Sequence, residues 1–180
     1  MNVSIDLSDV YLKTERLTIR PFIEKDLERI YKYSSNPKIA AMAGFIRHKD
    51  LAQSKELLDN YLVLNNSLAI CLDDKLIGSI TIERYPENIL PEFKHLWGRD
   101  IGFILDEDYW GQGYMPEALK IVIDYLFRVE DLDFLSCGHF LYNDQSRRVQ
   151  EKCGFKHYKL ARHIGPDGGE NTAWISILYR

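Results

Sequence analysis

Residues 108–118 read DYWGQGYMPEA and join an expected strand, Asp100–Leu105, to an expected helix. The apolar residues of that helix recur with helical spacing, at Met115, Leu119, Val122, Ile123, Leu126 and Phe127. The first N–H groups of a helix have no internal partner, and the helix dipole adds positive potential there. Gly111 and Gly113 carry no Cβ atom that would keep an anion from the backbone. The pattern therefore predicts an anion site before this helix.

The start of the helix supports the same prediction. Pro116 suits the first turn, where its missing N–H costs nothing. We expect the N-cap at Tyr114 or Met115, which have no side-chain oxygen to cap the helix, so the first N–H groups remain for an external partner. The dinucleotide fingerprint needs a glycine at position 116, and the chain has no GK[ST] sequence for a P-loop. The alternative interpretation is a tight loop in which the two glycines serve only the turn and bind no anion.

Two motifs resemble those of the GNAT acetyltransferases. Residues 108–118 are similar to the pyrophosphate-binding loop of that family, especially in the branch of ribosomal-protein N-terminal alanine and serine acetyltransferases. Residues 143–155, NDQSRRVQEKCGF, resemble the Asn-x-x-Ser…Lys-x-Gly-Phe signature of that branch. Residues 14–21, TERLTIRP, resemble its first strand, and 99–103, RDIGF, the strand before the loop. The resemblance spans about residues 14–179.

The resemblance implies an α/β (α+β) fold with a central, mostly antiparallel mixed sheet flanked by helices. Strands Asp100–Leu105 and Phe134–His139 would splay apart around the cofactor, within one domain spanning residues 1–180. The periodicity of the residues predicts strands at 14–22, 67–72, 76–84, 97–105, 134–139, 155–164 and 172–179. It predicts further helices at 49–65, at 143–153, and from Glu24 until Asn36-Pro37 stops the run.

Acetyl-CoA is the cofactor that the resemblance implies. Backbone groups of Phe103, Ile104 and Leu105 would pair with the pantetheine amides, as an added strand pairs with a sheet edge. The pyrophosphate would lie against the N–H groups of Trp110, Gly111, Gln112, Gly113, Tyr114 and Met115. The last helix would add contacts from Asn143, Ser146 and Lys152. Asn143 is also a good N-cap, and Arg147, Arg148 and Lys152 also suit a solvated helix face.

The sequence departs from the family pattern at two positions. Asp108 stands where the family often has Gln or Arg, so the backbone must do the phosphate binding. Gln150 stands where many members carry a tyrosine that protonates the leaving thiolate, and an amide cannot act as that acid. The nearby branch often lacks this tyrosine too.

Acetyl transfer to an alkyl amine is helped by a base, because most of the amine is protonated at neutral pH. Glu83 and Asp100 are the candidates, and a solvated strand-end carboxylate is the alternative for each. Ser146 is the candidate proton donor to the thiolate, and the alternative is a small residue packed in the first turn.

A covalent route is a further alternative. Cys137 and His139 lie on one face of a strand, which suggests transfer through an acyl-cysteine, although no third group orients the histidine.

We expect an N-acetyltransferase that works by direct attack in a ternary complex. The acceptor would be a protein N-terminal α-amine or a small-molecule amine, selected by the loops at 40–48 and 86–97. A catalytically silent acyl-CoA-binding sensor or scaffold is the alternative, which Gln150 favours. The protein would be a monomer or a homodimer.

Composition excludes several other classes. A formal net charge of -4 argues against nucleic-acid binding by a basic surface. No apolar run approaches the ~20 residues that span a bilayer, so we expect a cytoplasmic protein without a membrane partner. Cys71, Cys137 and Cys153 have no CxxC spacing, and we expect no metal site.

Overall fold

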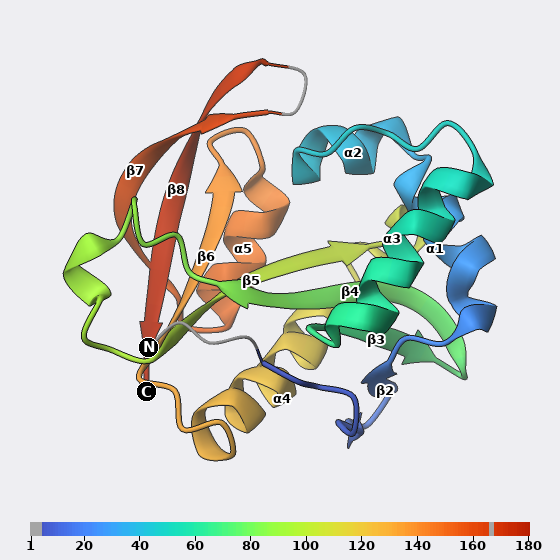
Figure 1. Cartoon of the computed structure of the whole chain (residues 1–180), viewed down its shortest axis with the longest axis horizontal. Coiled ribbons are helices and arrows are strands. Elements are labelled where there is room, and N and C mark those ends of the chain that lie inside the picture. The colour runs from blue at the N-terminus through green and yellow to red at the C-terminus, as the bar shows by residue number, and fades with distance from the viewer. Residues whose placement is uncertain (1–4, 166–167) are drawn as a thin grey trace.

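An eight-stranded sheet runs through the molecule in the order β1-β2-β3-β4-β5-β6-β8-β7 (Figure 1). The structure is a computed structural model that describes residues 5–165 and 168–180. The strands are β1 (Leu12–Lys13), β2 (Leu17–Pro21), β3 (Ser67–Leu72), β4 (Lys75–Arg84), β5 (Gly98–Leu105), β6 (Phe134–Phe140), β7 (Lys156–Ile164) and β8 (Glu170–Tyr179). All neighbouring strands are antiparallel except β5 and β6, which are parallel. The predicted mostly antiparallel mixed sheet is confirmed.

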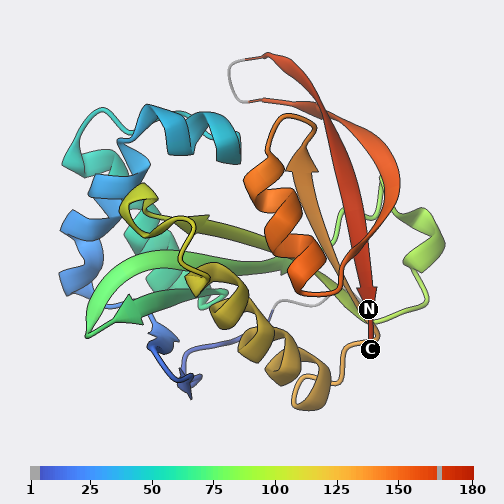
Figure 2. The same cartoon turned by 180° about the vertical axis from the view of Figure 1, so that it is seen from behind.

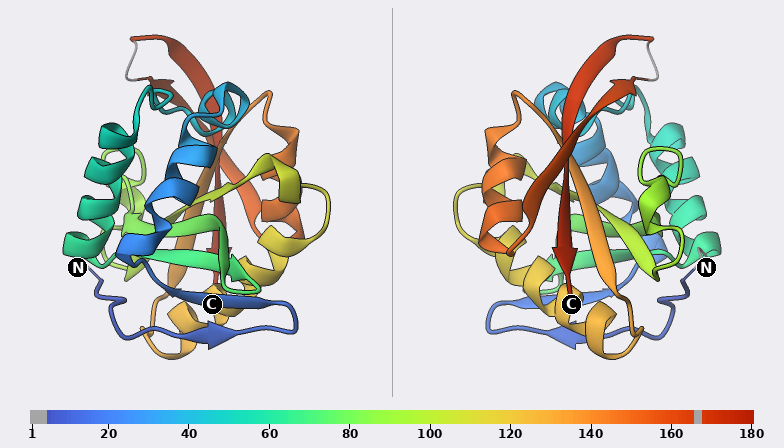
Figure 3. Two further views of the ribbon diagram at one scale, coloured as in Figure 1. Left: turned by 90° about the vertical axis from the view of Figure 1, so that its right-hand side faces the viewer. Right: turned by 90° about the vertical axis from the view of Figure 1, so that its left-hand side faces the viewer.

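Helices cover both faces of this sheet. They are α1 (Leu27–Ser34), α2 (Pro37–Ala43), α3 (Leu51–Leu64), α4 (Tyr114–Arg128) and α5 (Asp144–Lys152), with 3-10 turns at Glu24–Asp26, Pro91–Phe93 and Glu107–Tyr109. Figure 2 shows α4 and α5 on one face, and Figure 3 shows α3 on the opposite face. No helix in the described part of the chain is long and apolar enough to cross a membrane.

Alternation along the strands divides the core between the two faces. In β3, Leu68 and Ile70 pack in the cluster under α4, whereas Ala69 and Cys71 pack in the cluster under α1 and α3. This period of two is that of a strand buried on both faces, so the strand reads as a continuous apolar run. The same alternation decides which side chains of β4 and β5 reach each face.

One helix contradicts the sequence-based expectation. Asn36 and Pro37 do not only end α1, because they also begin α2. The Asn36 side chain accepts hydrogen bonds from the N–H groups of Lys38 and Ile39, and Pro37 occupies the first helical position. Strand β2 also begins later than predicted, at Leu17, with the short β1 before it.

The parallel strands β5 and β6 separate after a short pairing. Their register joins Gly98, Arg99 and Asp100 to Phe134, Leu135 and Ser136 and then stops, while β6 continues to pair with β8. Beyond Asp100, the edge of β5 that faces β6 has no partner strand in the described residues. The predicted splay is therefore present in the sheet.

Candidate active site

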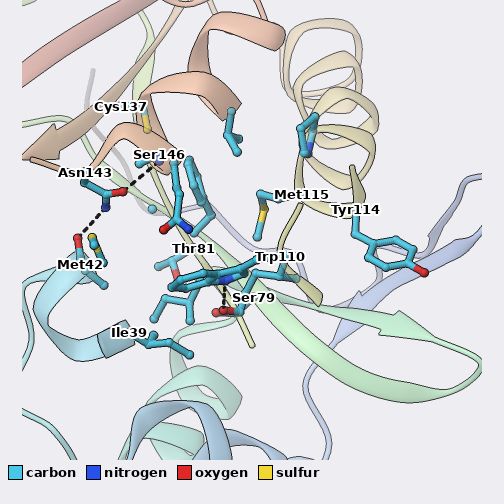
Figure 4. A pocket seen from close by; sticks show the side chains of 18 of the residues that line it. Ile39, Met42, Ser79, Thr81, Trp110, Tyr114, Met115, Cys137, Asn143 and Ser146 are labelled. Carbon is cyan, nitrogen blue, oxygen red and sulfur yellow. Dashed lines mark hydrogen bonds between the residues drawn. The ribbon is translucent and has the colours of Figure 1, made fainter. Parts of the chain in front are cut away.

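A cavity of about 680 Å³ opens at the point where β5 and β6 separate. Strands β4 and β5 line its centre, α2 and α3 line one end, and the loop after β5 with α4 and α5 lines the other. Figure 4 shows side chains from these elements converging on one space, among them Ile39, Thr81, Trp110, Met115 and Ser146.

The loop before α4 presents an uncovered row of backbone N–H groups. The N-cap is Gly113, at φ 82°, rather than the expected Tyr114 or Met115, and it supplies no side-chain cap. Gly111 lies at φ 76°, so both glycines hold a left-handed backbone that other residues adopt only at a cost. The Trp110 N–H, predicted as a phosphate contact, instead donates to the Glu107 carbonyl at 3.1 Å. No N–H group of residues 111–115 has a hydrogen-bond acceptor among the described residues. The loop thus has the geometry predicted for an anion site.

Thr14 and Arg16, in the connection between β1 and β2, contact this loop and the first turn of α4. The Arg16 guanidinium donates to the Gln112 carbonyl at 3.1 Å and to the Glu117 carboxylate at 2.7 Å. The same carboxylate accepts hydrogen bonds from the Arg16 N–H and the Thr14 hydroxyl. Arg16 also lies over the Tyr114 ring, 4.4 Å from its centroid. Residues 14–16, at the start of the TERLTIRP motif, therefore fix the position of the loop and the first turn of α4.

Two loop residues take positions that the motif alone does not reveal. The Asp108 carboxylate forms an ion pair with Lys32, which directs this acid toward α1. The Gln112 side chain donates to the Asp108 carbonyl, and Gln112 does not line the cavity. The predicted contact of Gln112 is its backbone N–H, and that prediction does not depend on the side chain.

The backbone of β5 offers fewer groups to a ligand than expected. Asp106 N–H donates to the Ile77 carbonyl, and antiparallel pairing alternates from there, so Ile104 directs its N–H and C=O toward β4. Phe103 and Leu105 direct theirs toward the open edge. The Leu105 carbonyl already accepts a hydrogen bond from the Trp110 indole at 2.8 Å. The remaining candidates are therefore both backbone groups of Phe103 and the N–H of Leu105.

Asp100 and Glu83 lie opposite each other on β5 and β4, and both line the cavity. Burial raises the pKa of Asp100 to about 7, against the lowering effect of a hydrogen bond from the Ser136 hydroxyl, and the charge of Glu83 raises it further. Glu83 is exposed at the cavity mouth. Asp100 thus has the pKa that suits a base near neutral pH.

On α5, Ser146 belongs to a hydrogen-bonded chain. The Gln150 side-chain NH₂ donates to Ser146 Oγ at 3.2 Å and to the Gly138 carbonyl at 3.1 Å. Its oxygen lies 3.1 Å from His139 Nδ1, which must therefore donate. Burial lowers the pKa of His139, which favours the neutral ring. The Ser146 hydroxyl lines the cavity and donates to no acceptor among the described residues.

The other predicted contacts on α5 divide into two groups. The Asn143 oxygen accepts from the Ser146 N–H as the N-cap, and its NH₂ donates to the Met42 carbonyl, so Asn143 joins α5 to α2 (Figure 4). Arg147 is occupied by Asp144 and Glu151. Arg148 and Lys152 line the cavity and remain candidates for a phosphate.

The acyl-cysteine alternative has no support in the geometry. Burial raises the pKa of the Cys137 thiol well above its usual value, which disfavours the thiolate. The Nδ1 of His139 is directed to Gln150 rather than to a thiol. All three cysteines are free, and no cluster of metal-ligating side chains occurs among the described residues.

The two segments predicted to select the acceptor, 40–48 and 86–97, differ in whether they line the cavity. Met42, Ala43 and Phe45 of the predicted 40–48 segment line the cavity. No residue of 86–97 does, because Leu90 and Phe93 are buried in a separate cluster against β6 and β8. The expectation that this second loop lines the pocket is therefore wrong. Sequence reasoning missed Ser136, because only the pairing of β5 with β6 brings its hydroxyl beside Asp100.

Comparisons with known proteins agree with this geometry. The probable N-acetyltransferase YjcK of Bacillus subtilis (strain 168) is 29% identical over 162 residues, which cover 84% of this chain and 86% of the relative. The ribosomal-protein-S5-alanine acetyltransferase of Vibrio fischeri has a TM-score of 0.72 at 19% identity, covering 95% of this chain and 97% of that one. The spermidine N-acetyltransferase of Vibrio cholerae, solved with CoA and spermine, has a TM-score of 0.75 at 16% identity, covering 92% and 96%. At these identities the two solved structures show the shared fold.

The family itself is shown by a family model. The GNAT acetyltransferase domain matches residues 16–156, which include the splayed strands, the loop and α5. The chain belongs to the GNAT family and is an N-acetyltransferase.

Proposed function

We propose that this enzyme transfers the acetyl group of acetyl-CoA to a primary amine, by direct attack while both substrates are bound. The observation that carries the proposal is that Asp100 and Ser146 line one cavity, at the point where β5 and β6 separate. The amine is a protein N-terminal α-amine or the amine of a small molecule. The N-acetyltransferases of Vibrio named above, one for a ribosomal protein and one for spermidine, are precedents for both classes.

The residues present fit acetyl-CoA. Unpartnered N–H groups at residues 111–115 suit a pyrophosphate, and Arg148 and Lys152 provide positive charge nearby. The free edge of β5 at Phe103 suits an amide-bearing chain. When bound, acetyl-CoA supplies a thioester whose carbonyl carbon is the electrophile. The N–H of Leu105 remains a candidate for the pantetheine chain rather than for that carbonyl, because five residues of β5, about 16 Å, separate it from Asp100.

We assign the role of base to Asp100. With a pKa of about 7, an ionised Asp100 accepts a proton from the incoming ammonium, directly or through a water. Glu83, at the mouth, attracts the cationic amine. The neutral nitrogen then forms a bond to the acetyl carbon as the carbon–sulfur bond breaks, and the second proton of the nitrogen leaves to solvent.

We assign to Ser146 the role of proton donor to the departing sulfur. Gln150 occupies one lone pair of its oxygen, and the hydroxyl proton has no acceptor among the described residues. A water in the cavity replaces the proton that Ser146 gives up. The missing tyrosine is thus compensated by an oriented hydroxyl rather than by Gln150 itself.

The test is the release of free CoA from acetyl-CoA by the purified chain, with mass detection of the acetylated amine. Equal amounts of the two products with at least one amine support the proposal. Binding of acetyl-CoA without release of CoA, for both peptides and small amines, would instead support the silent binding module.

A further inference from the structure

The charged side chains that line the cavity are separated by sign. Arg148 and Lys152 lie on α5, while Glu83 and Asp100 lie on β4 and β5. No other residue that lines the cavity within 5–165 and 168–180 carries a formal charge. The basic end adjoins the loop before α4, so the acidic end is the one that remains for the acceptor.

The wall above the acidic end is apolar. Helix α2 contributes Ile39, Met42 and Ala43, the segment after it contributes Phe45, and α3 contributes Leu57. The polar side chains at this end, Ser79, Thr81 and Tyr61, are uncharged groups of the floor and the side. A cation placed against the α2 wall would therefore meet no carboxylate among the described residues that form this wall.

The floor of this end is open at Gly102. Gly102 pairs with Thr81 and follows Asp100 on the same face of β5. A Cβ atom added at Gly102 would have only Thr81 Cβ near it, at 4.0 Å. Space for the body of a ligand therefore continues past the two carboxylates and under α2.

From this separation we infer that the acceptor is a primary monoamine on an apolar body. Its ammonium lies between Glu83 and Asp100, and its body lies over Gly102 against Met42 and Ile39. A polyamine is disfavoured on energetic grounds, because its second ammonium would be desolvated without a partner. The inference rests on the proposed function and specifies its acceptor. Apolar N-terminal residues of peptides and apolar small amines share this chemistry.

Hexylamine and hexamethylenediamine make a matched pair, since they differ only in the second ammonium. We expect kcat/KM for hexylamine to exceed that for the diamine about tenfold or more. A peptide beginning with phenylalanine and one beginning with lysine, each with an amidated C-terminus, form the peptide arm. Equal or better use of the diamine and of the lysine peptide would overturn the inference.

Direct binding separates this inference from the proposed function. Titration of both amines into the CoA-bound protein by calorimetry requires no turnover. Preferential binding of hexylamine without CoA release supports the acceptor class while the proposed reaction fails. Preferential binding of the diamine overturns the acceptor class whatever the activity.

Met42→Glu provides the reciprocal test, with Met42→Gln as an uncharged control of similar size. A carboxylate on the α2 wall gives a second ammonium its partner. The ratio of kcat/KM values should therefore move about tenfold toward the diamine in Met42→Glu only. An unchanged ratio in Met42→Glu, or the same change in both variants, would overturn the inference.

Discussion

The side-chain amide of Gln150 donates a hydrogen bond to the hydroxyl oxygen of Ser146, 3.2 Å away, from one turn further along α5. The amide cannot rotate freely, because it also donates to the Gly138 carbonyl and accepts from His139. Ser146 is therefore held by a buried chain of hydrogen bonds that begins on β6. In the proposed mechanism Gln150 and His139 are positioning residues, and Ser146 is the residue that would contact the substrate.

Ser146→Ala should lower kcat by about a hundredfold, the usual scale for a lost proton donor. Gln150→Leu should lower kcat about tenfold, because the hydroxyl loses its orientation. In the Ser146→Ala background, Gln150→Leu should have no further effect on kcat. Steady-state kinetics of the two variants and the double variant measure this coupling.

Glu151→Gln is the control, since it changes an exposed neighbour on the same helix. Its kcat should match that of the unaltered enzyme. Additive losses in the double variant would show that Gln150 acts only through the stability of α5.

Asp100 should give kcat/KM a rising limb with a midpoint near pH 7, because burial raises its pKa to about 7. The base is active only when ionised, so activity increases as pH rises through that value. Asp100→Asn should remove this limb and lower the plateau. A limb near pH 7 that persists in Asp100→Asn would assign the base elsewhere.

The same pKa has a consequence for stability. The folded protein keeps the Asp100 proton between the ordinary value of 3.8 and about 7, whereas the unfolded chain releases it. The folded state thus loses stability as pH rises through this window. Asp100→Asn should show a smaller decrease in the free energy of unfolding between pH 5 and pH 8, measured by urea titration. An identical decrease would contradict the raised pKa.

Arg16→Ala should weaken acetyl-CoA binding on the order of fivefold, because the loop carbonyl of Gln112 and the Glu117 carboxylate lose a common donor. The effect on kcat should be small, since Arg16 does not line the cavity. Calorimetric titration gives the affinity. Arg128→Ala, which breaks an exposed ion pair later on α4, is the matched control and should leave affinity unchanged.

Gly102→Val should narrow the acceptor end without straining the strand, because Gly102 lies outside the positive-φ region. The kcat/KM for hexylamine should decrease about tenfold more than that for methylamine, whose body does not extend over the floor. Equal losses for the two amines would place the acceptor somewhere else in the cavity.

Local patterns made the loop predictable. The effects of Gly111, Gly113 and Pro116 on the backbone are local, and the segment with helical periodicity that follows them is long. Strand β3 was also predictable, since its apolar run is buried on both faces. The resemblance to a family added the splay of β5 and β6, which no local pattern contains.

Contacts between distant segments were not predictable in the same way. The pKa of Asp100 depends on burial by elements from several parts of the chain and on Ser136, from a different strand. The role of Gln150 depends on His139 and Gly138 of β6. Asn36-Pro37 was ambiguous because the same pair ends one helix and caps the next.

The central claim is that the cavity at the splayed strands binds acetyl-CoA, and a thermal shift assay tests it most directly. Acetyl-CoA at about 100 times its dissociation constant should add roughly 2.7 kcal/mol to the free energy of unfolding. For a chain of this size the midpoint should rise on the order of 5–10 °C. NAD and ATP should give no comparable shift. No shift with acetyl-CoA, or an equal shift with NAD, would contradict the assignment of the loop before α4.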